Sequence, residues 1–180
     1  MRFAGQLLLA CAVLLVGAES ALAAEFTINV RGNDDGFGRV LAIGDFKPGR
    51  DPTLAAALDA YGVPSFKRRV STVGCRVGWN GPGVKVLFAN LGNGGACDRG
   101  RAQTARAFGD RWRTAKGLRV GQRLARLRSL YPSATRHRDT WWLVTALSRI
   151  GAPHRYPVLS ATVRGGRVQS FLLRILAAGD

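Results

Sequence analysis

Alternating apolar residues in the middle of the chain constrain the fold more than any other feature of the sequence. Apolar side chains recur at every second position from Val73 to Trp79, and again at Val84, Val86 and Phe88 in the segment from Val84 to Leu91. The turn-forming residues Asn80-Gly81-Pro82-Gly83 lie between the two runs. Because successive side chains of a strand point to opposite faces, this pattern predicts an antiparallel hairpin, Val70 to Trp79 with Val84 to Leu91, that has one buried face.

Further strand patterns lie on both sides of this hairpin. Phe26 to Arg31 and Arg39 to Ile43 surround the turn-rich residues 33–36 and predict an N-terminal hairpin. Near the C-terminus, Gly165-Gly166 is a strong signal for a two-residue hairpin turn. The strands expected in that part of the chain are Trp141 to Leu147, Val158 to Val163 and Val168 to Leu176.

Two main helices are predicted, one in each half of the chain. Apolar residues recur at helical spacing from Leu54 to Tyr61, after the start signal Asp51-Pro52-Thr53 and before Gly62. The second helix is expected to follow Gly117 to Gly121 and to end at Tyr131, ahead of Pro132. Residues Ala102 to Phe108 are expected to form a short helix or a turn. The residues expected to face the core from the second helix are Val120, Leu124, Leu127 and Tyr131.

These elements predict an α+β fold in which an antiparallel sheet carries two main helices packed on one face. Residues 24–180 suit a single domain, because a chain of this length buries enough apolar surface for one core. Residues 54–61 and 124–131 are identical at three of eight aligned positions. This match suggests a tandem helix-plus-meander repeat with halves of about 39–108 and 109–180, although such matches also arise by chance in Ala- and Leu-rich helices.

The first 23 residues have the pattern of a signal peptide. Arg2 provides a positive start, Leu7 to Val16 is a short apolar run, and Ala21-Leu22-Ala23 is an A-x-A cleavage site. The apolar run is shorter than the ~20 residues of a membrane span. We therefore expect an exported, secreted protein. A lipid anchor attached at Cys11, after Leu8-Leu9-Ala10, is the alternative.

Cleavage at this site would leave two cysteines, Cys75 and Cys97, in the mature protein. Disulfides persist outside the cytosol, so we predict a bond between these two residues. In the alternative interpretation, Cys75 is a catalytic nucleophile with His137 or His154 as its base.

The chain is strongly basic, with 27 lysines and arginines against 11 acidic residues and a net charge of +16. The basic residues include only four lysines, so arginine dominates. A GC-rich genome explains this bias without reference to function, whereas bidentate contact with phosphates or carboxylates explains it functionally. Residues 99–149 hold thirteen basic and two acidic side chains. The candidate anion-binding residues in this part are Arg119, Arg123, Arg126, Arg128, Arg136 and Arg138.

The sequence contains few residues suited to catalysis. It has no G-x-S-x-G, H-E-x-x-H or P-loop motif, and its two histidines are seventeen residues apart. We therefore predict no catalytic residue, no metal site and no cofactor. Trp141 and Trp142 alternate across a strand, so one ring should be buried and the other is a candidate exposed ring for stacking on a ligand. Gly92 to Gly95 is either an anion cradle or a flexible loop.

The segment Gly117-Leu-Arg-Val-Gly121, followed by Leu124, Leu127 and Leu130-Tyr131-Pro132, resembles exported proteins of high-GC Gram-positive bacteria that lack an assigned function. More distantly, it is similar to the tandem repeat of β-lactamase inhibitor proteins and to small outer-membrane assembly lipoproteins. Those families usually have Ser, Thr or Asp after the glycine, where this chain has Gln122. The resemblance covers residues 117–176, and residues 52–91 resemble the same families more vaguely. It implies a layered α+β fold whose sheet presents a binding face, and no catalytic residue.

Three classes of function follow from the sequence. The first is a non-catalytic exported module that binds an extracellular protein through its sheet face. The second is an electrostatic binder of a polyanion, such as an acidic wall polymer, an anionic lipid or a nucleic acid, through the six arginines named above. The third is a secreted cell-wall hydrolase, which would need a cleft joining a histidine to a carboxylate or to a free Cys75.

Overall fold

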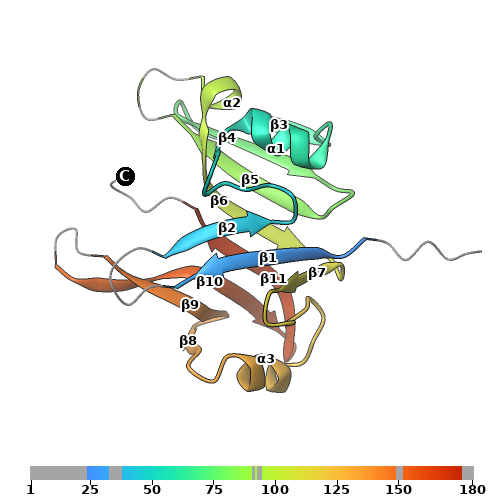
Figure 1. The fold of residues 1–180 in the computed structure, drawn as a ribbon, viewed down its shortest axis with the longest axis vertical. Coiled ribbons are helices and arrows are strands. Elements are labelled where there is room, and N and C mark those ends of the chain that lie inside the picture. The colour runs from blue at the N-terminus through green and yellow to red at the C-terminus, as the bar shows by residue number, and fades with distance from the viewer. Residues whose placement is uncertain (1–23, 33–37, 91, 93–94, 149–151, 176–180) are drawn as a thin grey trace, which may run out of the picture.

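The computed structural model describes residues 24–32, 38–90, 92, 95–148 and 152–175 (Figure 1). Its main feature is an eight-stranded antiparallel sheet with the strand order β3-β4-β5-β6-β11-β10-β9-β8. The proposed signal peptide and the alternative lipid site at Cys11 lie outside the described residues. The strands of this large sheet are β3 (Phe66–Arg69), β4 (Gly74–Trp79), β5 (Val84–Ala89), β6 (Arg101–Phe108), β8 (Thr135–His137), β9 (Thr140–Ser148), β10 (His154–Arg164) and β11 (Arg167–Arg174).

A small sheet crosses one face of the large one. It contains β2 (Arg39–Ile43), β1 (Phe26–Arg31) and β7 (Trp112–Thr114) in that order, with β1 antiparallel to β2 and parallel to β7. In Figure 1, β1 and β2 pass in front of the middle strands of the large sheet. The predicted N-terminal hairpin is therefore confirmed, and it serves as a cover for the larger sheet.

Three short helices complete the described part of the chain: α1 (Leu54–Tyr61), α2 (Ala96–Arg99) and α3 (Leu124–Leu130). The predicted boundaries of α1 are confirmed. The Thr53 hydroxyl accepts a hydrogen bond from the Ala56 N–H, and Gly62, with φ of 74°, donates to the Leu58 carbonyl as the helix ends. α3 ends where expected, but it spans only seven residues because 117–123 contain turns and two isolated bridges, at Arg119 and Arg123.

The predicted fold class is wrong, because the molecule is mostly β and does not have two main helices packed on a sheet. The small sheet, rather than a layer of helices, covers much of the large one. Residues 102–108, predicted as a short helix or a turn, belong to β6. Their alanines favour a helix locally, but Ala105 and Ala107 lie opposite buried residues of β5, so packing in the sheet overrides that preference.

The elements recur in a symmetric order around the centre of the large sheet. α1 precedes β3 to β6, and α3 precedes β8 to β11. The two groups of four strands meet at the antiparallel pair of β6 and β11, and β3 and β8 form the two outer edges. Within the part of the chain that the structure describes, the small sheet and α2 have no counterpart in this symmetric order.

The large sheet has an inner face that forms the core and an outer face that the small sheet leaves uncovered. Val77, Val86, Ala105 and Leu173 lie opposite one another on neighbouring strands of the inner face, and each is at most 1% exposed. The Trp79 indole donates to the Gly62 carbonyl at the end of α1, which ties that helix to the inner face. The residues between the inner-face positions point to the outer face.

Tyr61 links α1 to the small sheet. Its hydroxyl donates to the Ile43 carbonyl, and its ring centre lies 5.2 Å from that of Trp79. Burial, with a smaller contribution from the negative charge of Asp45, raises the pKa of the Tyr61 hydroxyl above its ordinary value.

We expect the free energy of unfolding to fall as the pH rises above about 10, the pKa of a tyrosine in an unfolded chain. The unfolded chain releases the Tyr61 proton at lower pH than the folded protein does, so deprotonation favours unfolding. The Tyr61→Phe variant has no hydroxyl proton to release at this position. In urea titrations, its free energy of unfolding should therefore fall less between about pH 9 and about pH 11 than that of the wild type. Some loss should remain because burial also raises the pKa of Tyr131. Equal losses in the two proteins would show that Tyr61 does not cause this dependence.

Candidate anion-binding face

The outer face of the large sheet carries a cluster of positive charge over β3 to β6. We call this cluster the basic sheet face and define it as Arg68, Arg76, Lys85 and Arg106, all of which are exposed. The four side chains line an open hollow of about 410 Å³. The other residues around that hollow are Phe66, Val86, Leu87, Thr104 and Leu172.

The strand pattern places these cations on the outer face. Arg76 lies between the buried Cys75 and Val77, and Arg106 lies between the buried Ala105 and Ala107. Lys85 is likewise flanked by two buried valines. Because neighbouring residues in a strand alternate between faces, burial of the flanking side chains directs the charged ones to the opposite side.

Cross-strand register brings like charges together on this face. Arg68 lies directly opposite Arg76, and Lys85 lies directly opposite Arg106. The Cβ atoms of such pairs are about 5 Å apart, and like charges at this separation destabilise a sheet. Four consecutive strands therefore each contribute one cation to a small area.

No acidic side chain lines the hollow of the basic sheet face in the described part of the chain. Asp98 pairs with Lys67 at 3.1 Å. Lys67 points to the inner face, because its two neighbours in β3 point to the outer face. Glu25 pairs with Arg113, which is in β7 of the small sheet, and with Arg119. The positive charge of the basic sheet face is thus left uncompensated by the carboxylates that form ion pairs within the described residues.

Aromatic rings lie around the amine of Lys85. Its Nζ is 4.9 Å from the ring centre of Phe108 and 5.9 Å from that of Phe66, within the range of cation–π attraction. Gly78 makes the position of Phe66 possible, because a Cβ at Gly78 would lie 2.2 Å from the Phe66 ring. The Phe66 ring therefore lies over the backbone of β4, on the outer face of the sheet.

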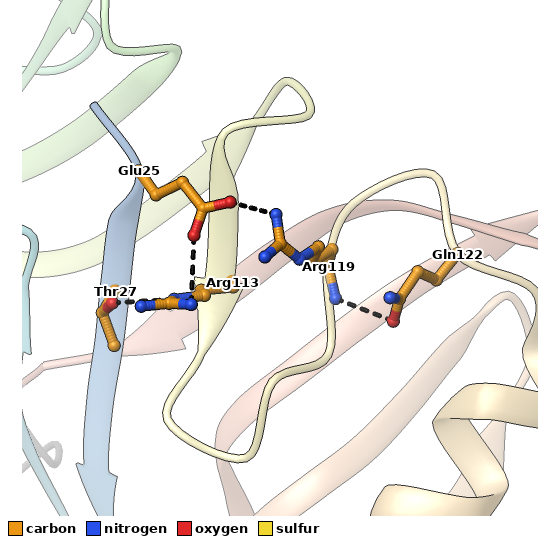
Figure 2. Close-up of polar contacts among 5 residues, drawn as sticks. All are labelled: Glu25, Thr27, Arg113, Arg119 and Gln122. Atoms are coloured by element: carbon orange, nitrogen blue, oxygen red, sulfur yellow. Dashed lines mark hydrogen bonds and ion pairs between the residues drawn. The ribbon is translucent and has the colours of Figure 1, made fainter. Parts of the chain in front are cut away.

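Arg119, the first of the arginines proposed from the sequence, is paired with a carboxylate. Figure 2 shows Glu25 between Arg113 and Arg119, with an Arg113–Glu25 distance of 3.0 Å. The Arg113 Nε also donates to the Thr27 hydroxyl, and the Gln122 side chain accepts from the Arg119 backbone N–H at 3.1 Å. This network joins the chain before β1 to the segments around β7, so it has a structural role.

The other arginines proposed from the sequence are divided among different surroundings. The Arg128 guanidinium lies 5.1 Å from the Trp141 ring centre, and Arg136 donates to the Arg138 carbonyl. Arg136 and Arg138 line a hollow of about 390 Å³ with Arg164, but Asp139 lies there too. Arg123 and Arg126 lie exposed at the start of α3. The structure therefore groups only part of this set.

The two neighbouring tryptophans lie on opposite sides of β9. Trp141 is 7% exposed and lies opposite Ala161 on the inner face. Trp142 lies opposite Ser160 on the outer face, is half-buried, and stacks on His137 with ring centres 3.7 Å apart. Trp142 and His137 line a hollow of about 830 Å³ at the edge of β9, together with Val30 of β1 and Lys116.

The disulfide predicted between Cys75 and Cys97 is confirmed, with a Cα–Cα distance of 5.0 Å. It joins β4 to α2 and removes the free thiol that a Cys75 nucleophile would need. His154 lies at the start of β10, where its ring contacts the Ala152 carbonyl. The described residues contain no group of three or more His, Cys, Asp or Glu side chains suited to hold a metal ion. The loop at 92–95 lies partly outside the described residues.

None of the helices in the described residues is long and apolar enough to cross a membrane. No protein-family model, curated protein or solved structure matches this chain.

Proposed function

We propose that the protein is a non-catalytic module that binds a polyanion on the basic sheet face. The main support is the pair of cross-strand contacts in which Arg68 faces Arg76 and Lys85 faces Arg106. Each contact destabilises the free protein, and a bound anion placed between the two cations would turn the repulsion into attraction. The binding surface thus differs from the one proposed on sequence grounds, which used arginines of the C-terminal half.

The composition of the face also supports this function. Arginine holds phosphates, sulfates and carboxylates through two parallel hydrogen bonds, and three of the four cations are arginines. The net charge of +16 attracts polyanions to the whole molecule, and the basic sheet face gives that attraction one location.

The proposed site of action is outside the cytosol. The disulfide between Cys75 and Cys97 is a feature that persists in oxidising compartments, and the first 23 residues have the pattern of a signal peptide. Acidic wall polymers, anionic lipids and released nucleic acids are all polyanions of such compartments.

An acidic protein is the second candidate partner. Phe66, Leu87 and Leu172 lie among the cations, and half-buried apolar side chains mixed with arginines are common in protein interfaces. Such a partner would bind through the same face, so the same variants test it.

Neutralising the face should weaken polyanion binding. We expect Arg76→Gln with Arg106→Gln to lower affinity about tenfold at about 0.15 M salt. Each contact between a cation and a phosphate releases counterions and so favours binding, and the variant loses two such contacts. The matched control, Arg126→Gln with Arg136→Gln, removes the same net charge from another surface and should change affinity much less. Fluorescence anisotropy with labelled polyphosphate, a sulfated polysaccharide and polyglutamate provides the measurement.

The two pairs of substitutions also separate this proposal from a diffuse charge effect. Equal losses in the face variant and the control variant would show that net charge alone drives binding. Absence of binding to all three polymers, or affinity that does not fall as salt rises, would contradict polyanion binding as a function.

A further inference from the structure

The outer face continues beyond the basic sheet face as rows of side chains that cross several strands. One row runs from Phe66 through Gly78, Lys85 and Arg106 to Leu172, each residue directly opposite the next. The same row continues through Ser160 to Trp142 on β9. An aromatic ring therefore lies near each end of this row, and the cations Lys85 and Arg106 lie in its middle.

A second row lies two residues along the strands from the first. It runs from Arg68 through Arg76, Leu87 and Thr104 to Arg174 on β11. Cations consequently occur on five neighbouring strands, two of them in the first row and three in the second. The Cβ atoms of neighbouring cationic residues are about 5 Å apart within a row and roughly 7 Å apart diagonally between rows.

These rows suit a linear ligand that runs across the strands. Strands in a sheet are about 4.8 Å apart, so the cations from β3 to β11 extend over roughly 19 Å and the path to Trp142 over roughly 29 Å. Stacked nucleotides advance about 3.4 Å each, so a path of this length holds about eight of them. A compact anion would contact only one of the like-charge pairs.

The aromatic side chains favour a ligand with flat groups as well as charges. Phe66 and Phe108 flank Lys85, and the stacked rings of His137 and Trp142 end the first row. His137 is exposed, so the outer side of its ring is open to a further flat group. Grooves that combine a line of cations with aromatic rings bind single-stranded nucleic acids, whose phosphates and bases use the two features together.

We propose that the polyanion is a single-stranded nucleic acid that lies across the strands of the large sheet from β3 to β9. This inference rests on the proposed function and specifies its ligand. The phosphates contact Arg68, Arg76, Lys85, Arg106 and Arg174 in turn. Bases stack near Phe66 at one end and on the His137–Trp142 pair at the other.

The test compares the full-length mature chain with oligothymidylates of four to sixteen nucleotides, an abasic phosphodiester of twelve units, a DNA duplex and polyglutamate. We expect affinity to rise steeply up to about eight nucleotides and to level off beyond that length. The abasic chain should bind at least about tenfold more weakly than the thymidylate of equal length, because it offers no base for stacking. The duplex, whose bases are already stacked, should also bind more weakly.

Two variants report on the aromatic ends. Phe66→Leu and His137→Ala should each weaken thymidylate binding several-fold and leave abasic binding unchanged, and thermal unfolding shows whether each variant is folded. Binding that depends on the basic sheet face could be equally tight for the thymidylate and the abasic chain, or for the thymidylate and polyglutamate. Either result would overturn this inference and leave the proposed function in place. Absence of face-dependent binding to every polymer would overturn both.

Discussion

Replacing both Arg76 and Arg106 with glutamate is expected to abolish polyanion binding while leaving the folded protein at least as stable as the wild type. Two attractive contacts with the ligand become repulsive, so affinity should fall by about 100-fold or more at physiological salt. The introduced carboxylates would face Arg68 and Lys85 across the strands, so opposite charges would replace both like-charge pairs. Relief of this repulsion should raise the free energy of unfolding on the order of 0.5 kcal/mol per pair.

A binding assay and a urea titration on the same preparation check both parts of this prediction. The control is Arg126→Glu with Arg136→Glu, which makes the same change in net charge on another surface. We expect the control to keep most of its affinity. A charge-reversed face variant that binds as well as the wild type, or that unfolds at much lower urea, would contradict the role assigned to these residues.

Loss of the disulfide is expected to be strongly destabilising. It closes a loop with a sequence separation of 22 residues, for which chain-entropy arguments give about 3 kcal/mol. A small domain has only about 5–15 kcal/mol in total, so this is a large fraction. Cys75→Ala with Cys97→Ala should lower the melting temperature by roughly 6–12 °C in calorimetry.

The disulfide and the binding face can be separated experimentally. Arg76 follows Cys75 in β4, but its position on the outer face is set by pairing with β3 and β5. We therefore expect the double alanine variant to bind polyanions normally at a temperature where it is folded. An unchanged melting temperature would show that the bond adds nothing to stability, and lost binding by the folded variant would show that it also organises the face.

Local features of the fold are predictable from the sequence. Hairpins marked by Gly-rich turns and the helix from Leu54 to Tyr61 depend on residues within a few positions of one another, so the sequence pattern identifies them. The disulfide is predictable because Cys75 and Cys97 are the only cysteines after the proposed cleavage site.

Features that depend on distant residues are not predictable in this way. β6 is rich in alanine, and its alternation is interrupted where the register with β5 shifts between Leu87 and Phe88. Its role as a central strand follows from burial against β5 and β11, which no local pattern reveals. The large sheet is therefore more extensive than the sequence pattern predicts, and the two predicted main helices are short elements of eight and seven residues.

The basic sheet face was missed for the same reason. Charge counts direct attention to residues 99–149, whereas three of its four cations lie outside that range. A local signal was nevertheless present: Arg76, Lys85 and Arg106 each stand between two small or apolar residues of a strand. Recognition of β6 as a strand would have made this shared pattern visible, but the cross-strand partners come only from the register.

Arginine footprinting tests most directly whether the polyanion binds to the basic sheet face. Phenylglyoxal modifies accessible arginines, and mass spectrometry of peptides gives the modified fraction at each position with and without a twelve-nucleotide oligothymidylate. We expect the ligand to slow modification of Arg68, Arg76 and Arg106 and to leave Arg126 and Arg136 unaffected. Protection of Arg126 and Arg136, with Arg68, Arg76 and Arg106 modified at the same rate in both samples, would place binding on the C-terminal arginines and contradict the account.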